Sequence, residues 1–290
     1  MISICIPAYK DNPNPLVKSL LDQNKNLNAV KEILIYDDAS PVPIELEMDH
    51  DLVSITRGEK NLNNFFARRY LAQLAQSDYV LFMDADLLPA QEDFLQQYHQ
   101  LIPTTYDIIH STISYETSPP AQDGMLRWKY GREREMRTAT RPDNNYELFV
   151  SACFMVKKDL FLARTSATFP DTRYGSDIFL SALWRRAGLQ LFLMDNPVIH
   201  LGLEDNQSFL NKSLKAIETT VANERAGLIP ENHRPVQRAY LRLKSYGLTI
   251  PFLGLISRCK AFMWRNLVSK KPKLLYLDLL KLHHYAQLKR

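Results

Sequence analysis

The first hundred residues alternate short apolar runs with segments whose apolar residues have helical spacing, and a chain with this pattern has few folds open to it. Four runs rich in β-branched or aromatic residues are typical of strands, at 2–6, 32–36, 53–56 and 79–83. Helical spacing occurs at 14–24 and 64–76. Strands that alternate with helices in this way build a mostly parallel sheet flanked by helices, so we predict an α/β fold.

After residue 107 the pattern is less regular, although further elements can be predicted. Three more strands are expected at 108–113, 149–156 and 189–194, and two more helices at 177–187 and 206–225. Gly188 stands where a helix commonly ends on a glycine. Residues 119–145 are polar and rich in arginine, with few apolar anchors, so we predict a long loop there.

Acidic residues follow two of the predicted strands directly. Asp37 and Asp38 come after the second strand, and Asp84 and Asp86 come after the strand at 79–83. Open α/β sheets bind ligands beyond the carboxyl ends of their strands. Both acidic pairs are therefore expected at one ligand-binding edge of the sheet.

The stretch YVLFMDADLLP offers two carboxylates separated by one residue. Hard divalent cations prefer oxygen ligands, and a D-x-D turn can supply one or two while leaving positions for phosphate oxygens. Such an ion can stabilise the negative charge that grows on a departing diphosphate. The alternative is that Asp84 and Asp86 only cap a following helix.

Three stretches in the first hundred residues, SICIPAYK, IYDDAS and FFARRYLAQLAQSDYVLFMDADLLP, resemble in order and spacing the signatures of the family 2 glycosyltransferases. The resemblance implies a GT-A fold, an inverting transfer from a nucleotide sugar such as a UDP-sugar, and a Mn²⁺ or Mg²⁺ cofactor. It also implies a set of donor-side residues. These are Pro7, Ala8 and Tyr9 lining the nucleotide pocket, Asp38 at the base, Arg68 near the diphosphate, Asp84 beside the ribose and metal, and Asp86 as the principal metal ligand.

The second half of the chain resembles the same family less closely. In FPDTRYGSDIFLSALWRRAGLQLFLMDNPVIHLG, the resemblance implies that Asp177 is the general base, while Ser176 stands where the family has a glutamate. His200 matches a position that can supply a further metal ligand, and imidazole suits Mn²⁺ better than Mg²⁺. The predicted organisation is a catalytic domain at 1–230, with a nucleotide-binding half at 1–105 and an acceptor-binding half at 106–230, followed by a basic helical extension at 231–290.

Each of these residues also has a purely structural interpretation. Asp37 and Asp38 could form an Asx turn after a strand. Arg68 could lie on a solvated helix face, Asp177 could be a helix N-cap, and a histidine beside an apolar run is often structural.

The charge of the chain is concentrated at its C-terminal end. The net charge is +4, but residues 231–290 carry 13 Lys/Arg against two Asp/Glu, a local net of +11 that leaves −7 for the rest. Aromatic and aliphatic residues are interleaved with these cations, as in helices that lie on anionic membranes. The alternative is that the apolar faces pack on the protein or on a second subunit. Nucleic acid is disfavoured as a partner because no recognised binding motif accompanies the charge.

Other features indicate where the protein works. The three cysteines are scattered, so neither a disulfide framework nor a zinc site is indicated. An apolar run directly after Met1 leaves no room for a signal peptide. We therefore expect a cytoplasmic protein that is peripheral on the inner face of the cell membrane.

Three functions are compared. A hexosyltransferase would act on a glycan or lipid-linked acceptor in polysaccharide or glycolipid synthesis. Nucleotidyltransferases share a similar sheet but open with a glycine-rich phosphate loop, whereas this chain has Pro7, Ala8 and Tyr9 there. A non-catalytic carbohydrate-binding or membrane-binding protein with the same fold is the remaining alternative.

Overall fold

A computed structural model describes the chain except for residues 121–122, 137–140, 143–145, 147–148 and 166–174. The described residues group into two units. The first unit comprises Met1–Tyr115, Met136–Arg173 and Arg186–Gly202, and the second comprises Glu116–Glu135, Tyr174–Arg185 and Leu203–Arg290.

Within the described residues, the first unit contains one nine-stranded mixed sheet. In spatial order its strands are β3 (Val53–Arg57), β2 (Val30–Asp37), β1 (Ile2–Ala8), β4 (Tyr79–Met83), β8 (Cys153–Lys157), β6 (Ile108–Ser114), β9 (Leu191–His200) and β5 (Leu87–Pro89), with β7 (Arg141–Pro142) paired to β9. Strands β3, β2, β1 and β4 are parallel, whereas β8 runs antiparallel to both of its neighbours. The predicted α/β sheet is therefore confirmed.

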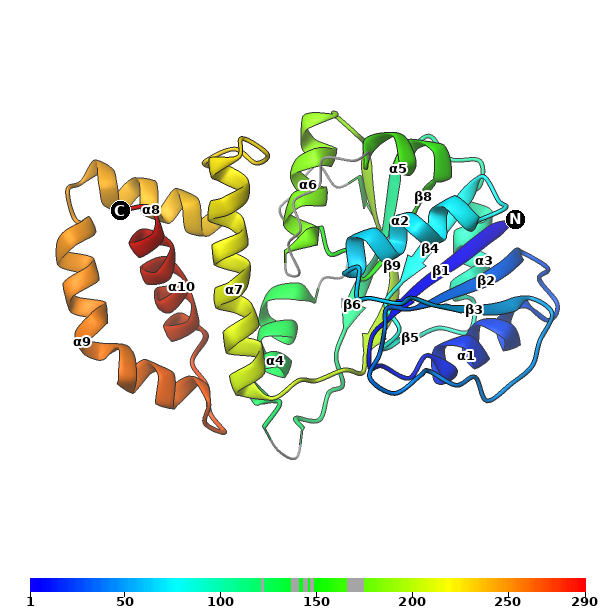
Figure 1. Cartoon of the computed structure of the whole chain (residues 1–290), viewed down its shortest axis with the longest axis horizontal. Helices are drawn as coiled ribbons and strands as arrows, with labels where there is room; N and C mark the ends of the chain where they lie inside the picture. Colours follow the sequence, from blue (N-terminus) through cyan, green and yellow to red (C-terminus); the bar gives the residue numbers. More distant parts are fainter. Residues whose placement is uncertain (121–122, 137–140, 143–145, 147–148, 166–174) are drawn as a thin grey trace. The chain divides into compact units, whose positions relative to one another are not determined.

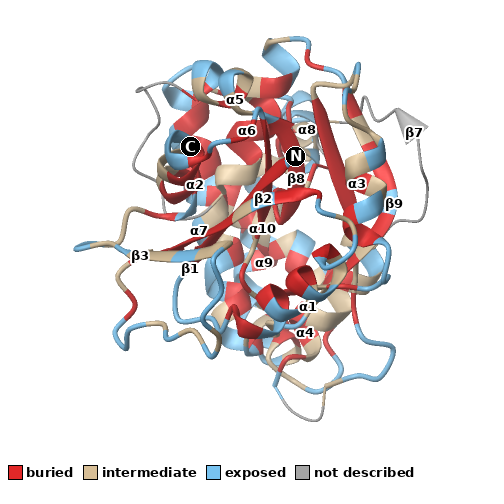
Figure 2. Ribbon diagram, turned by 90° about the vertical axis from the view of Figure 1, so that its right-hand side faces the viewer, coloured by how far each residue is buried: buried red, intermediate tan, exposed pale blue. Residues whose placement is uncertain are grey.

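In the described part of the first unit, four helices flank the sheet: α1 (Asn14–Asn24), α2 (Asn64–Leu74), α3 (Phe94–Gln100) and α5 (Lys158–Arg164). Helix α2 packs beside α5, and α1 packs beside α3 on the other face of the sheet (Figure 1). The central strands β1, β4, β8 and β6 are buried along most of their length, whereas edge strand β3 has no buried residue (Figure 2). Helix α1 has the predicted bounds, whereas α2 ends two residues before its predicted end.

Strand β9 corrects one expectation, because its predicted end at residue 194 is wrong. The strand continues to His200, and Asn196 and Pro197 lie inside it. Ser111 pairs with Met194 and Ile113 with Val198, so β9 holds two extra residues in this interval. Proline is tolerated at such a bulge because no ladder hydrogen bond is required of its nitrogen.

The predicted loop at 119–145 is also partly wrong. Helix α4 (Met125–Tyr130) and a π-helical turn, η1 (Gly131–Glu135), occupy part of it, and other residues of that range lie outside the description. Leu126 is buried, and its N–H donates to Asn206 Oδ1 at 2.6 Å. A helix of only six residues, MLRWKY, is therefore held in place by contacts with a distant helix. The strand predicted at 149–156 begins only at Cys153.

The second unit is helical. Besides α4 and η1 it contains α6 (Ser176–Arg186) up to Arg185, α7 (Asn206–Arg225), α8 (Pro235–Ser245), α9 (Thr249–Leu267) and α10 (Leu274–Leu288). Helix α10 packs against both α7 and α9 (Figure 1). One buried cluster joins four of these helices: Leu126, Phe209, Leu210, Ile256, Met263, Leu267, Leu274, Leu277 and Leu280. No helix in the described part of the chain is long and apolar enough to cross a bilayer.

Candidate functional site

Three parallel strands of the first unit bring the predicted donor-side residues to one edge of the sheet. Strand β1 ends at Ala8, β2 at Asp37 and β4 at Met83. The Asp38 N–H donates to the Ala8 carbonyl oxygen at 2.9 Å, which joins the turn after β2 to the end of β1. Pro7 and Ala8 are the last residues of β1, and Tyr9 follows with its side chain exposed.

The two acidic residues after β2 have different roles. Asp37 accepts hydrogen bonds from the backbone N–H of Ser40 at 2.9 Å and of Ile44 at 3.3 Å, as in an Asx turn. Burial acts to raise the pKa of Asp37, but the hydrogen bonds from Ser40 and Ile44 outweigh it and lower the pKa below its usual value. Asp38 accepts from the Leu62 N–H at 2.5 Å and so holds the loop after β3.

A pocket of about 580 Å³ opens beside this turn. The loops after β1 and β2 form its walls, and Lys10 N–H donates to Ser40 Oγ at 2.9 Å where the loops meet. Its lining residues are Lys10, Asp11, Asn12, Asn14, Pro41, Val42, Pro43, Ile44, Glu45 and Glu47.

Arg68 is fully buried in α2, so its interpretation as a solvated helix residue is wrong. Its Nη2 donates to Asp84 Oδ1 at 2.6 Å and to the Ser151 carbonyl oxygen at 2.7 Å. Asn64 Nδ2 lies 3.3 Å from the same Asp84 oxygen. The orientation of Asp84 is therefore set by a buried guanidinium that has little freedom to move.

Asp86 lies in the turn between β4 and β5, and neither Asp84 nor Asp86 caps a helix, because strand β5 follows. Strand β5 pairs antiparallel with β9, with Leu87 opposite His200. His200 Nε2 lies 3.6 Å from Asp86 Oδ2, and both side chains are partly exposed. The pairing of β5 with β9 thus places the predicted metal ligands side by side.

Two residues that sequence reasoning missed shape the surroundings of Asp86. A Cβ atom on Gly202 would lie 2.1 Å from Asp86 Oδ2, so only glycine leaves room for this carboxylate. The Tyr115 ring stacks on the His200 imidazole, with centroids 5.6 Å apart and planes 17° apart. Gly202 could have been noticed in the sequence because it stands two residues after His200, in the tripeptide HLG. Its contact with Asp86 could not, because the two residues are more than a hundred positions apart.

These residues fit a divalent cation. Metal bonds to oxygen and nitrogen are about 2.0–2.2 Å long, so two ligands of one ion stand about 3–4 Å apart. The 3.6 Å separation of Asp86 and His200 lies in that range. Among the described residues no group of three or more His, Cys, Asp or Glu could hold a metal. A site with so few protein ligands is typical of ions that share their coordination with water and substrate phosphates.

Asp177, the predicted base, belongs to the second unit, where it is the second residue of α6. Its carboxylate influences Tyr130 in the same unit. Burial raises the pKa of Tyr130, the carboxylates of Glu135 and Asp177 raise it further, and the guanidinium groups of Arg234 and Arg127 oppose them. The structure thus brings together the donor-side candidates of the first unit and places Asp177 among charged groups of the second.

Comparison with known proteins gives a family and a fold. Residues 3–163 match the family model "Glycosyl transferase family 2". No curated protein matches the chain. The crystal structure of S. aureus TarS 1–349 is similar with a TM-score of 0.53 and 14% identity, covering 99% of this chain and 90% of that one.

Two further structures are larger than this chain. The structure of GalNAc-T7 with UDP, GalNAc and Mn²⁺ is similar with a TM-score of 0.50 and 15% identity, covering 70% of this chain and 43% of that one. A longer S. aureus TarS structure has a TM-score of 0.48 and 13% identity, and the match covers 76% of this chain and 39% of that one. The chain therefore spans less than half of these two proteins.

Proposed function

The chain belongs to glycosyl transferase family 2, and from this premise we propose that it transfers a sugar from a nucleotide sugar to an acceptor hydroxyl. The observation that carries the proposal is the arrangement of Asp84, Asp86 and His200 beyond the carboxyl end of β4. Asp84 is oriented by Arg68, and Asp86 lies 3.6 Å from His200. Open α/β sheets bind nucleotides at this edge.

We assign the nucleotide to the first unit. Asp38 would accept a hydrogen bond from the base, and the end of β1 at Pro7 and Ala8, together with Tyr9, would cover one side of it. The neighbouring pocket of about 580 Å³ supports this assignment, because it lies between the loops that follow β1 and β2. A uracil ring offers an N–H to a carboxylate, which favours a UDP-sugar as donor. Arg68 is buried behind Asp84, so we propose that it acts on the donor through that carboxylate.

Asp86 and His200 would hold the cation, with Asp84 beside them. A bound Mn²⁺ or Mg²⁺ would stabilise the negative charge of the departing nucleoside diphosphate. A mixed oxygen and nitrogen donor set favours Mn²⁺. Gly202 keeps space for the Asp86 carboxylate, and the Tyr115 ring restrains the His200 imidazole.

Asp177 is our proposed general base. It would accept the proton of the acceptor hydroxyl while the acceptor oxygen forms a bond to the anomeric carbon. The bond from that carbon to the diphosphate breaks, its electron pair leaves with the diphosphate, and the configuration inverts. Asp177 lies in the first turn of α6, and a carboxylate is a side chain that can act as a general base. We further propose a hexose as the transferred sugar and a glycan or lipid-linked acceptor in polysaccharide or glycolipid synthesis.

Release of free nucleoside diphosphate tests the proposal. The purified chain is incubated with a panel of nucleotide sugars and Mn²⁺, alone and with glycan or lipid-linked acceptors. We expect release from one donor, and a decrease of about a hundredfold or more in Asp86→Asn. Asp22→Asn, at an exposed aspartate of α1 that forms an ion pair with Lys25, is the matched control. Binding of a nucleotide sugar without release of nucleoside diphosphate would favour a non-catalytic binding protein. Equal release by Asp86→Asn and Asp22→Asn would show that the proposed site is wrong.

A further inference from the structure

Large apolar side chains are exposed on the C-terminal helices of the second unit. Twelve large hydrophobic residues are exposed among the described residues, and seven of them fall between residues 241 and 275. These seven are Leu241, Tyr246, Leu248, Ile250, Leu255, Phe262 and Leu275. Isolated exposed apolar residues are ordinary, but a concentration of them marks an interaction surface.

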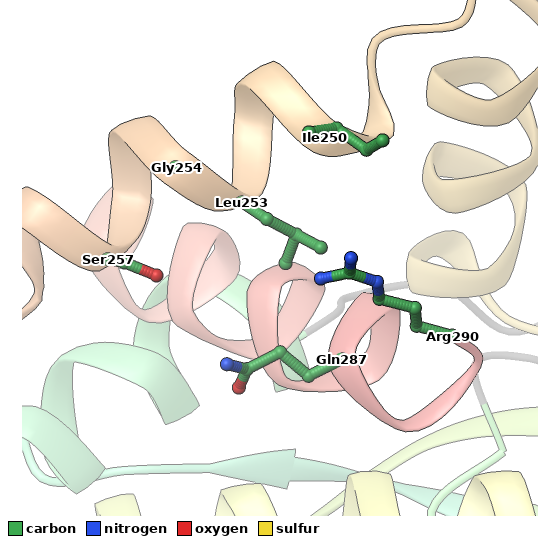
Figure 3. Close-up of a pocket in the computed structure, with 6 residues that line it drawn as sticks. All are labelled: Ile250, Leu253, Gly254, Ser257, Gln287 and Arg290. Carbon is green, nitrogen blue, oxygen red and sulfur yellow. The ribbon is translucent and has the colours of Figure 1, made fainter.

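Helix α9 has two apolar faces, and only one of them is covered. Leu253, Ile256 and Met263 are buried in the clusters shared with α7 and α10. Figure 3 shows Leu253 pointing from α9 toward α10, where Gln287 and Arg290 line a pocket of about 470 Å³ with it. Ile250 lines the same pocket and is 71% exposed, whereas Leu255, on the opposite side of the helix from Leu253, is 61% exposed. A helix that only packed against its own unit would be polar on the opposite side.

The uncovered face of α9 is both apolar and basic. Leu255, Arg258, Phe262 and Arg265 follow one another at intervals of three and four residues, so they share one side of the helix. All four are exposed, with Leu255 at 61% and Phe262 at 62%. We call Leu255, Arg258, Phe262 and Arg265 the outer face of α9.

No acidic residue lies near this face in the sequence. Residues 232–277 contain ten Lys/Arg and no Asp or Glu, so α8 and α9 carry positive charge alone. A second copy of the chain docked symmetrically on the outer face would bring arginines against arginines, which is unfavourable. Nucleic acid would satisfy the arginines but would leave Ile250, Leu255 and Phe262 in water. An anionic bilayer satisfies both kinds of side chain.

We propose that the outer face of α9 docks on the headgroup region of an anionic lipid bilayer, with the exposed side chains of Tyr246, Leu248 and Ile250 at the start of the helix entering beside it. The apolar side chains enter the boundary between headgroups and acyl chains, and Arg258 and Arg265 contact lipid phosphates. Docking requires neither a donor nor a metal ion, so this proposal goes beyond the transfer reaction and stands independently of it.

Vesicle co-sedimentation of the full chain tests this surface. We expect binding to mixed phosphatidylglycerol and phosphatidylcholine vesicles, and binding at least about tenfold weaker to phosphatidylcholine alone. The triple variant Ile250→Ser, Leu255→Ser, Phe262→Ser should lower the partition coefficient about a hundredfold. The double variant Arg258→Gln, Arg265→Gln should lower it about tenfold or more on the anionic vesicles only.

Leu74→Ser is the matched control, because Leu74 is an exposed leucine at the end of α2 in the first unit. It should bind vesicles like the wild type, and circular dichroism should show the same helix content in all variants. A wild-type chain that binds neither vesicle would overturn the proposal, as would a triple variant that binds like the wild type. An oligomer in solution that the triple variant dissociates, without lipid binding by the wild type, would assign the face to a second copy instead.

Discussion

Substitution of Gly202 by alanine should displace the Asp86 carboxylate, although glycine has no side chain that could take part in binding or catalysis. The added Cβ would lie 2.1 Å from Asp86 Oδ2 and 3.0 Å from Asp86 Cγ. Because Cβ contacts under 3.0 Å essentially never occur, the oxygen must retreat by about 1 Å. The Leu201 N–H donates to the Asp86 carbonyl oxygen at 2.9 Å, which ties the two backbones together. The side chain of Asp86 is therefore the part that moves.

The expected cost follows from that displacement. A misplacement of about 1 Å in a reacting constellation can lower the rate by about a hundredfold, which corresponds to about 2.7 kcal/mol. We therefore expect kcat/KM of Gly202→Ala to fall by about two orders of magnitude, and the Mn²⁺ concentration for half-maximal activity to rise. Initial rates of nucleoside diphosphate release across a Mn²⁺ titration measure both quantities, and direct Mn²⁺ binding by calorimetry measures the second without turnover.

Gly254→Ala is the control for this experiment. A Cβ on Gly254 would meet no atom within 4 Å, and the backbone there suits any residue. This variant should retain wild-type rates and the wild-type Mn²⁺ dependence. If Gly202→Ala also retained both, the carboxylate of Asp86 would not be a metal ligand in the position described, and the reasoning would fail.

Three further outcomes are expected. Asp84→Asn should lower the free energy of unfolding by about 2–3 kcal/mol, because it leaves the buried charge of Arg68 without its carboxylate partner. Urea denaturation measures this loss, and an unchanged urea midpoint would contradict the expectation. Asp177→Asn should lower kcat by about a thousandfold while calorimetry shows unaltered donor affinity, and a loss of donor affinity instead would argue against its role as base. Burial acts to raise the pKa of Glu224, but hydrogen bonds from Lys289, Tyr285 and Gln237 outweigh it and lower that pKa. The ionised Glu224 carboxylate therefore stabilises the fold fully at pH values above the pKa of an unfolded glutamate, about 4.3, and this stabilisation is lost as the pH falls through the lowered pKa of the folded state. The difference in Tm between wild type and Glu224→Gln should therefore narrow as the pH falls from about 7 to about 3, and a difference that is constant with pH would contradict this.

Elements with a strong period and clear end signals could be predicted well from the sequence. Strand β4, helix α1 and helix α7 have the predicted bounds, because each couples regular apolar spacing to residues that end it. Helix α7 begins after Asp205, whose side chain accepts from the Ser208 N–H at 2.9 Å. Local chemistry decides such boundaries.

Elements that depend on distant partners were missed. Asn196 and Pro197 are typical of a turn, but pairing of β9 with β6 and β5 carries the strand through them as a bulge. Helix α4 has only six residues, too few to show a helical period, and Asn206 of α7 accepts a hydrogen bond from its backbone. Neither partner can be identified from local periodicity.

The same division applies to the candidate site. The carboxylates after β2 and β4 were found because each follows a strand directly, and such positions meet at one edge of a parallel sheet. The buried state of Arg68 was not foreseen, because its partner Ser151 lies 83 residues further along the chain. Gly202 and Tyr115 were missed since their contacts depend on how β5, β6 and β9 align.

The central claim is that Asp86 and His200 hold a divalent cation through which a nucleoside diphosphate is bound. Isothermal titration of UDP into the wild type and Asp86→Asn, each with Mn²⁺ and with EDTA, measures this directly. We expect binding in the wild type only when Mn²⁺ is present, and binding by Asp86→Asn to be at least about a hundredfold weaker. Equal affinity for UDP in all four titrations would contradict the claim.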